Sequence, residues 1–535
     1  MPRYGKIYPV MKIKSKDVIN LIWSAVFGAC IATGIRVEKT IGEGIPAIVY
    51  FLIWIAAGAV TFLIMTRLDK VRKDAACPSL HGPFPKKFFF TLFISFFILY
   101  IPALLAAFPG FFCYDANTES YMVFTFKYSN HHPLIHELLL GNCLRVGYRL
   151  FGNYNAGVTL YVIFQMIVMS AVFAFLLATL KQINVKKPAL IISFIFPAFF
   201  PTIRMFVVCT TKDVLFSAGI VLFTTALLRY IIAHQKSDMW ILFIGTCMIL
   251  FFRNNGIYIL PILSIVIFIF FKEHRKTLIP IITGIVLYIV TIEALIALLP
   301  AKRGEQAEML SVPMQQLARA YTLNKESFTQ EELNTLYNIF PEVILERYNP
   351  KLADDIKFNF LEDNFKADKG RYAKLWWNIF LKNPGHYMDA FLIMTDGYWY
   401  PGTAITGYEG KLINTITYGE SAYFQYESEP PAVASPIFKG LNSFYKSLSL
   451  DIKWQRIPVL NLILSPATYV WLFLFAMAIS LKTKNDLKLL FIMPFLLLLT
   501  LLLGPIALVR YALPFMMMTP LTAIYLFDIK KGISK

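Results

Sequence analysis

Apolar residues occur along this chain in long runs separated by short polar links. Runs such as 214–232 and 489–503 approach the length of about 20 residues that a helix needs to cross a bilayer. The runs do not alternate between apolar and polar residues, as the strands of a membrane barrel would. The pattern predicts an all-α transmembrane bundle of about 12 spans. We expect the spans at residues 18–36, 46–66, 88–108, 156–180, 189–203, 214–232, 239–252, 256–271, 278–299, 456–481, 487–508 and 510–528.

The composition favours a membrane protein over a soluble one. Hydrophobic residues make up 57% of the 535 residues and charged residues 16%, whereas soluble domains have about 45–50% and about 25%. The formal net charge of +18 does not indicate a nucleic-acid partner, because Lys and Arg are concentrated in the links between apolar runs. These basic links lie at residues 3–16, 67–87, 181–187, 272–276, 482–488 and 530–535.

Basic links mark the cytoplasmic side of a membrane protein. If every second link is a basic one, both termini lie in the cytoplasm and the number of spans is even, as in the expected list. The chain is therefore predicted to be a multi-pass protein of the plasma membrane, with the lipid bilayer as a partner. Two long segments then fall on the outer side, residues 109–155 and residues 300–455.

The expected domains follow from these two segments. They are a membrane domain at 1–299 with nine spans and the first external loop at 109–155, an extracytoplasmic domain at 300–455, and the last three spans at 456–535. The external domain is long enough to fold by itself, and charged stretches predict a mixed, mostly helical structure. Its aromatic strings at 376–377 and 396–402 suit sugar recognition, with contact to the membrane interface as the alternative.

The start of the first external loop carries candidate catalytic carboxylates. Asp115 and Glu119 are four residues apart and share one face if a helix begins here. A carboxylate at the edge of the hydrocarbon is disfavoured in its charged form unless cations lie near it, so it is either paired or held for function. We predict Asp115 and Glu119 as catalytic residues, and His131 and His132 as substrate-binding residues. The alternative is that Asp115 caps a helix and the histidines are solvated.

Four expected turns on the outer side carry basic residues, although the positive-inside rule disfavours them there. They are Arg204, Lys212, Arg253 with its neighbour Asn254, and Arg510. Arginine and lysine side chains around one outward cavity suit an anionic head group, above all a phosphate. We predict that these residues bind the substrate or the donor phosphate. Ordinary ion pairing between helices, such as Lys212 with Asp213, is the alternative.

Short motifs in the membrane part carry a resemblance to a known class. They are Phe108-Pro-Gly110, Ser129-Asn-His-His-Pro133, Thr211-Lys-Asp213, Phe252-Arg-Asn-Asn-Gly256, Gly504-Pro505 and Arg510-Tyr-Ala-Leu-Pro514. With this layout the chain resembles the GT-C class of membrane glycosyltransferases and a family of uncharacterised bacterial membrane proteins of that architecture. In that class an acidic residue just beyond a span, in the first large external loop, is the catalytic base. The resemblance implies this role for Asp115, with Glu119 as a second candidate.

The resemblance implies an inverting glycosyltransferase of the EC 2.4 class that uses a polyprenyl-phosphate-linked sugar. The sugar would pass to a glycan, polymer or lipid acceptor outside the cell, for modification of the bacterial cell envelope. The chain departs from the class because its external segment precedes the last three spans. The first loop lacks a clear paired acidic motif, so no metal site is predicted. Use of a divalent metal as a cofactor is left open.

Two other functions remain as alternatives. A transporter or flippase of a lipid-linked or anionic substrate would also use outward cations, but it is expected to show internal repeats and charges deep in several spans. The second alternative is a non-catalytic scaffold or a transferase of another group, such as phosphoethanolamine. A phosphoethanolamine-type enzyme needs histidine metal ligands in a long external domain, and residues 300–455 contain only His386.

Overall fold

The computed structural model describes residues 15–39, 44–72, 78–112, 115–304, 306–403, 434–454 and 457–527. Throughout these ranges the regular secondary structure is helical, with isolated β-bridges but no strand. The all-α prediction is therefore confirmed. The predicted cytoplasmic position of the two termini concerns residues outside the described ranges, and it stays a prediction.

Within the residues that the structure describes, six helical segments are long and apolar enough to cross a membrane. They are α1 (Ser15–Val37), α2 (Ala47–Arg72), α3 (Lys86–Ala106), α6 (Tyr154–Gln182), α9 (Lys212–Ala233) and η1 (Lys272–Thr277) continued by α12 (Leu278–Leu298). The number becomes eight if each of two bent pairs is one span. These pairs are α7 (Lys187–Phe199) with α8 (Pro201–Val207), bent by 55°, and α21 (Pro458–Leu464) with α22 (Pro466–Leu481), bent by 67°.

The predicted number of twelve spans is wrong, because several apolar runs do not form one long helix. Two runs form α10 (Lys236–Phe252) and α11 (Gly256–Phe270), with only 17 and 15 residues. The last two runs each divide, into η6 (Asp486–Phe491) with α23 (Ile492–Leu501) and into α24 (Val509–Met517) with α25 (Thr519–Phe527). Pro520 follows the break before α25, where its missing N–H removes a helical hydrogen bond.

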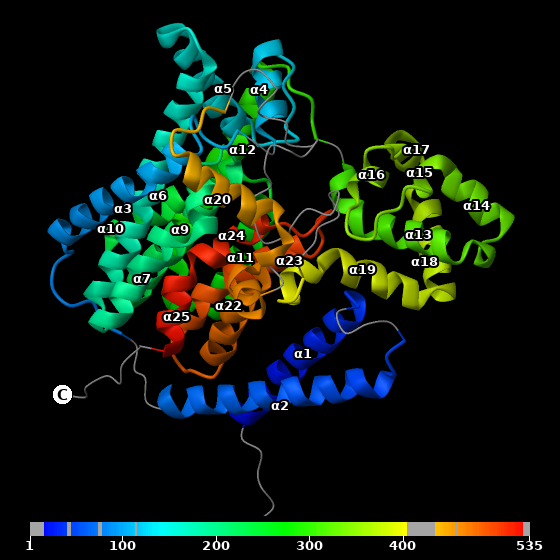
Figure 1. Cartoon of the computed structure of the whole chain (residues 1–535), viewed down its shortest axis with the longest axis horizontal. Coiled ribbons are helices and arrows are strands. Elements are labelled where there is room, and N and C mark those ends of the chain that lie inside the picture. The colour runs from blue at the N-terminus through cyan, green and yellow to red at the C-terminus, as the bar shows by residue number, and fades with distance from the viewer. Residues whose placement is uncertain are drawn as a thin grey trace, which may run out of the picture.

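The helix α9 lies at the centre of the bundle. Of its most apolar window, 89% is buried within the protein, against 11% for α2. It packs against α6, α10 and α24, and Figure 1 shows it inside the bundle. The outer helices expose large apolar side chains such as Leu63, Ile192 and Ile279, as expected of surfaces that contact lipid. The first residue of the central helix is Lys212.

The segment predicted as the first external loop contains two helices that pack on each other, α4 (Ala116–Thr125) and α5 (Leu134–Phe151). The helix α5 also packs along α6. Both helices end at a residue in the left-handed conformation, Phe126 after α4 and Gly152 after α5. These stops turn the chain back, so that both helices remain near one end of the bundle (Figure 1).

Helices of the segment 300–455 form a group with a hydrophobic cluster of its own. They are α13 (Ser311–Leu323), α14 (Gln330–Tyr337), α15 (Glu342–Leu345), α16 (Asp354–Lys357), α17 (Glu362–Ala367) and α18 (Lys369–Lys382). Leu336, Phe340 and Ile379 are fully buried in this cluster, and Figure 1 shows the group on one side of the bundle. The next helix, α19 (Pro384–Trp399), leads back to α1 and α22. Residues 404–433 lie outside the described ranges, and α20 (Lys439–Leu450) follows them.

Candidate functional site

Backbone pairing fixes the start of the first external loop beside the residues that precede α9. The Phe111 N–H donates to the Val208 carbonyl at 2.9 Å, and the Thr210 N–H donates to the Phe111 carbonyl at 2.9 Å. Asp115 lies four residues beyond Phe111, and Lys212 lies two residues beyond Thr210. The pairing therefore brings these two charged side chains to the same place.

A glutamine of α6 holds the same stretch from the other side. The Gln165 amide nitrogen lies 3.2, 2.9 and 2.8 Å from the carbonyl oxygens of Phe206, Val207 and Cys209, to which it donates. Its amide oxygen accepts from the Tyr161 hydroxyl at 3.2 Å. Because these backbone carbonyls would otherwise be buried with fewer partners, the contact fixes both the chain and the orientation of the amide.

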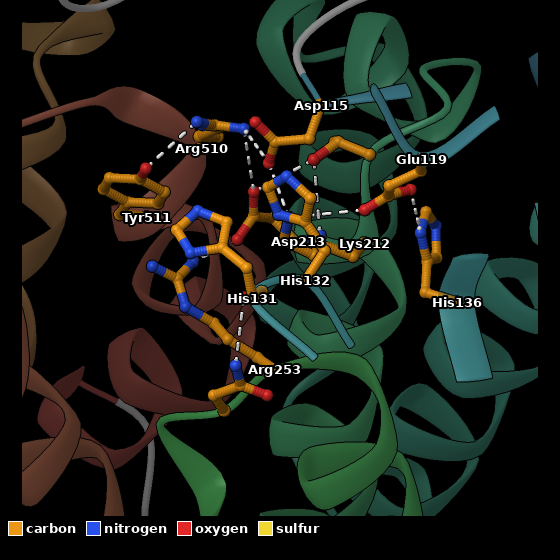
Figure 2. Close-up of polar contacts among 12 residues, drawn as sticks. Asp115, Glu119, His131, His132, His136, Lys212, Asp213, Arg253, Arg510 and Tyr511 are labelled. Atoms are coloured by element: carbon orange, nitrogen blue, oxygen red, sulfur yellow. Dashed lines mark hydrogen bonds and ion pairs between the residues drawn. The ribbon is translucent and has the colours of Figure 1, made fainter. Parts of the chain in front are cut away.

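Lys212 joins three groups of the first external loop, as Figure 2 shows. Its ammonium nitrogen lies 2.5 Å from Asp115 Oδ2, 3.4 Å from Glu119 Oε1 and 3.0 Å from His132 Nδ1. The side chain is only 12% exposed, and that of Glu119 is 1% exposed. A lysine has three N–H donors, and here each has an acceptor.

Two arginines complete the cluster. Arg510, in α24, places Nη1 3.1 Å from Asp115 Oδ2 and 3.7 Å from Asp213 Oδ2, and its Nη2 donates to the Tyr511 hydroxyl at 3.0 Å. Arg253, between α10 and α11, forms an ion pair with Asp213 and lies over the Tyr511 ring at 4.2 Å from its centre. Three carboxylates and three cations from distant parts of the sequence thus share one site.

A buried chain of hydrogen bonds extends behind Glu119. His136 Nδ1 lies 2.6 Å from Glu119 Oε2, and His136 Nε2 lies 2.7 Å from the Tyr161 hydroxyl oxygen. The side chains of His136 and Glu119 are 0% and 1% exposed. The series from Gln165 through Tyr161 and His136 to Glu119 therefore connects α6 with the ammonium of Lys212.

Burial and the neighbouring charges of the cluster determine the protonation of Asp115, Glu119 and His132. Burial acts to raise the pKa of Asp115, but the charges of Arg510 and Lys212 outweigh it and hold that pKa well below its usual range. Burial also opposes the ionisation of Glu119, and the opposite charges beside it lower its pKa all the same. Burial, with the charge of Lys212, lowers the pKa of His132 to about 3. At neutral pH the two carboxylates are ionised and His132 is a neutral acceptor.

Glu137 differs from these carboxylates because no described residue is its hydrogen-bond partner. Its side chain is completely buried, and neither carboxyl oxygen has a hydrogen-bond partner among the described residues. Burial, with the negative charge of Glu119 nearby, raises the pKa of Glu137 to about 9. Glu137 is thus a neutral carboxylic acid at neutral pH, next in sequence to His136.

The loop that carries His131 and His132 forms the edge of the cluster. The Asn254 side-chain nitrogen donates to the carbonyls of Asn130 at 3.4 Å and His131 at 3.2 Å, which holds His132 toward Lys212. The His131 ring nitrogen Nε2 lies 3.8 Å from Glu308, a residue of the external segment. A small pocket opens beside the loop, lined by polar Asn130, His132 and Asn254 and by apolar Leu134, Phe251 and Ile292.

The segment 300–455 supports the turn that precedes α24, the helix that carries Arg510. The Ala353 N–H donates to the Pro505 carbonyl at 2.9 Å, and the Tyr398 hydroxyl donates to the Ile506 carbonyl at 3.1 Å. Leu352 packs against Ile506 in a small apolar cluster. The turn before α24 therefore depends on residues 350–400 for its shape.

Most of the predicted site residues meet in this cluster. Those in it are Asp115, Glu119, His132, Lys212, Arg253 and Arg510, and those at its edge are His131 and Asn254. Arg204 does not join them, because its Nη2 donates to the Leu99 carbonyl at 3.0 Å and it forms no ion pair within the described residues. Asp115 precedes α4 but makes no side-chain cap, and Asp213 pairs with Arg253 rather than with Lys212.

Sequence reasoning missed the buried polar residues behind the cluster. Tyr161 and Gln165 stand four residues apart in an otherwise apolar run, so they share one face of α6. Polar side chains within a membrane span are costly unless they have partners. That spacing was the available signal, whereas nothing in the sequence linked the pair to His136.

The donor atoms of the first loop also allow a metal to be considered. One ligand atom each of Asp115, Glu119 and His132 lies within 4.8 Å of the others. The same three groups accept the hydrogen bonds of Lys212, so an ion would have to displace the ammonium. The arrangement fits a charge-paired cluster better than a metal centre.

A model described as a family of unknown function (DUF6020) matches residues 122–532, which is most of the chain. The match includes Lys212, Arg253 and Arg510 and begins after Asp115 and Glu119. No curated protein and no solved structure matches the chain.

Proposed function

We propose that this chain, which belongs to the DUF6020 family, is a GT-C-like membrane glycosyltransferase that moves a sugar from a polyprenyl phosphate to an acceptor outside the cell. One observation carries the proposal. Asp115, an acidic residue just beyond the span α3, is held in a buried cluster by Lys212 and Arg510. A catalytic base and the cations that a leaving phosphate needs therefore occupy one site.

The pairing of Asp115 explains how a donor activates the base. While Lys212 and Arg510 bind Asp115, they keep its pKa low, and the carboxylate is a weak base. When the donor phosphate binds these two cations, its negative charge offsets theirs, and burial then raises the pKa of Asp115. Asp115 thus becomes basic when the donor is in place.

The transfer step then needs no further residue to accept a proton. Asp115 takes the proton of the acceptor hydroxyl while the hydroxyl oxygen attacks the anomeric carbon of the sugar. The bond from that carbon to the phosphate oxygen breaks, and the lipid phosphate leaves with the bonding electrons. Lys212, Arg253 and Arg510 neutralise the charge that develops on it.

Glu119 has a positioning role in this mechanism. Its two oxygens accept hydrogen bonds from Lys212 and His136 at 3.4 and 2.6 Å. Both oxygens are therefore already engaged by the protein and do not act as the base. The carboxylate keeps the ammonium of Lys212 between the two helices that supply the site. Asp115 is therefore the catalytic carboxylate and Glu119 supports it.

The test is transfer of labelled sugar from a polyprenyl-phosphate donor pool in membranes that contain the wild-type protein or Asp115→Asn at equal level. We expect Asp115→Asn to lose transfer by at least about 100-fold, because general-base catalysis contributes about 10²- to 10⁴-fold. Asp238→Asn is the matched control, since Asp238 is a buried carboxylate paired with Arg229 in another part of the bundle. Equal transfer by Asp115→Asn and Asp238→Asn would contradict the proposal.

A further inference from the structure

The helix α19 runs across the C-terminal end of α1 and does not continue along it. A β-carbon at Gly34 would stand 2.1 Å from Cγ of Tyr400, and Arg36 pairs with Asp389 at 2.7 Å. Asp389 and Tyr400 are eleven residues apart, which is about 16 Å along a helix. Gly34 and Arg36 are only two residues apart, or about 3 Å along α1. The two helices therefore cross at a large angle, and Figure 1 shows α19 passing the end of α1.

The crossing puts α19 level with one end of the span α1. The apolar part of α1 that is long enough to cross a membrane ends at Val37, and the charged residues Arg36 and Glu38 mark that end. Glu38 pairs with Lys351, which in turn pairs with Asp396 of α19 at 3.0 Å. A helix that crosses the end of a span at a large angle lies nearly in the membrane plane, at the level of the headgroups.

The helices α18 and α19 present a small apolar surface beside this end of α1. Trp377, Leu381 and Met388 are each more than half exposed, and we call these three residues the α18–α19 face. The Trp377 ring contacts the Phe380 ring, with 5.3 Å between the ring centres. The Phe380 ring contacts that of Tyr387, the neighbour of Met388, at 5.6 Å. Leu381 stands four residues after Trp377, on the same side of α18, so the face is continuous.

The composition of this face differs from that of the aromatic cluster behind it. Trp376 is half-buried, its indole N–H donates to Gln316 at 2.9 Å, and its ring stacks on that of Phe380. Trp376 therefore belongs to the interior of the helix group. Lys374, which is exposed and stands three residues before Trp377, adds a cation beside the face. An exposed tryptophan with aliphatic neighbours and a lysine suits the headgroup layer of a membrane.

We infer that the α18–α19 face rests on the headgroup layer of the phospholipid bilayer beside the C-terminal end of α1. Exposed apolar surface continues to that level on α2, which packs along α1 and begins with exposed Ile48 and Phe51. A protein partner is disfavoured, because three side chains cover far less than the about 800 Å² per partner of a stable complex. The inference does not depend on the proposed function. It fixes the residues 350–400, which support the turn before α24, relative to the membrane.

The first test replaces Trp377 by photoreactive benzoylphenylalanine in the full-length chain, in membranes of the expressing cells. The control carries the same group in place of Val343, an exposed apolar residue of α15, a helix that Figure 1 shows on the side of the group away from α19. Irradiation should add the mass of one phospholipid to the peptide that contains position 377 and not to the one that contains position 343. A cross-link from position 377 to another polypeptide, no lipid adduct there, or equal lipid capture at both positions would overturn the inference.

Fluorescence measures the same contact without a bulky probe. The emission of Trp377 is the difference between the wild-type protein and Trp377→Phe, both reconstituted at full length in phosphatidylcholine vesicles. Phosphatidylcholine with acyl chains brominated close to the headgroup should quench this emission more strongly than iodide in the water does, because the indole ring lies among the lipids. Quenching by iodide but not by the brominated lipid would place Trp377 in water and would contradict the inference.

Discussion

Replacement of Lys212 by methionine should destabilise the fold by about 3 to 5 kcal/mol. Methionine fills similar space but leaves the carboxylates of Asp115 and Glu119, which lie 2.5 and 3.4 Å from the lysine nitrogen, without that cation. Removing one partner of a buried ion pair costs this much because it leaves a charge uncompensated. The lower end of the range is expected, since Arg510 remains 3.1 Å from Asp115 and His136 remains 2.6 Å from Glu119.

The assay is the free energy of unfolding from a denaturant titration in detergent, repeated across pH. The depressed pKa values of Asp115 and Glu119 stabilise the wild-type protein above the unfolded pKa, about 4, and this contribution is lost as pH falls through the lower folded values. In Lys212→Met much of the contribution is absent. The difference between the two proteins should therefore be full at pH 7 and shrink below about pH 4.

An exposed ion pair provides the control. Lys453 lies 2.6 Å from Asp451, but their side chains are 61% and 37% exposed, so Lys453→Met should cost much less than Lys212→Met. If Lys212→Met costs no more than this control at pH 7, the buried cluster does not depend on Lys212. A loss that is the same at every pH would also refute the reasoning, because it would come from packing and not from charge.

Three further changes test the structure around the cluster. Gly110→Ala should cost about 1 to 3 kcal/mol of unfolding free energy, because Gly110 has φ +144° and a β-carbon there would stand 2.6 Å from Val162 Cγ2. Gly440→Ala is the control and should cost nothing, because a β-carbon at Gly440 would have no atom within 4 Å. Gln165→Leu should cost at least about 2 kcal/mol in the same titration, because the Val207 and Cys209 carbonyls lose the amide that donates to them. Glu137→Gln should gain about 1 to 3 kcal/mol over the wild type at pH 8. That gain should vanish below about pH 4. The pKa of Glu137 is about 9 in the folded protein and about 4 in the unfolded chain, so the wild-type side chain destabilises the fold more and more as pH rises between these two values.

The sequence predicted the meeting of the charged residues better than it predicted the helices that carry them. Lys212, Arg253 and Arg510 are expected at outward turns and Asp115 at the start of the first external loop, all beside the ends of apolar runs, and the structure brings the four together. The number of spans was wrong because run length does not show where a helix stops. The last run, for example, divides between Met517 and Thr519, although its hydropathy is continuous.

The partners of each charge depend on geometry that residue spacing alone does not contain. Lys212 and Asp213 are adjacent in sequence and therefore point in directions about 100° apart on α9, so they face different neighbours. Lys212 meets Asp115, and Asp213 meets Arg253. Arg204 was expected beside them, but a bend of 55° between α7 and α8 places its guanidinium on the Leu99 carbonyl. Only the folded chain decides these pairings.

Stability alone does not account for the cluster. A buried ion-pair network is often no more stable than apolar side chains of the same volume, and this bundle has apolar residues available around it. Under the proposed function, the charges provide a set of donors that a phosphate can take over. In that mechanism Asp115 is a weak base while Lys212 and Arg510 are paired with it, and the charge of the bound phosphate makes it a stronger one. Donor binding and activation of the base would then be one event, which would prevent Asp115 from deprotonating an acceptor when no donor is bound.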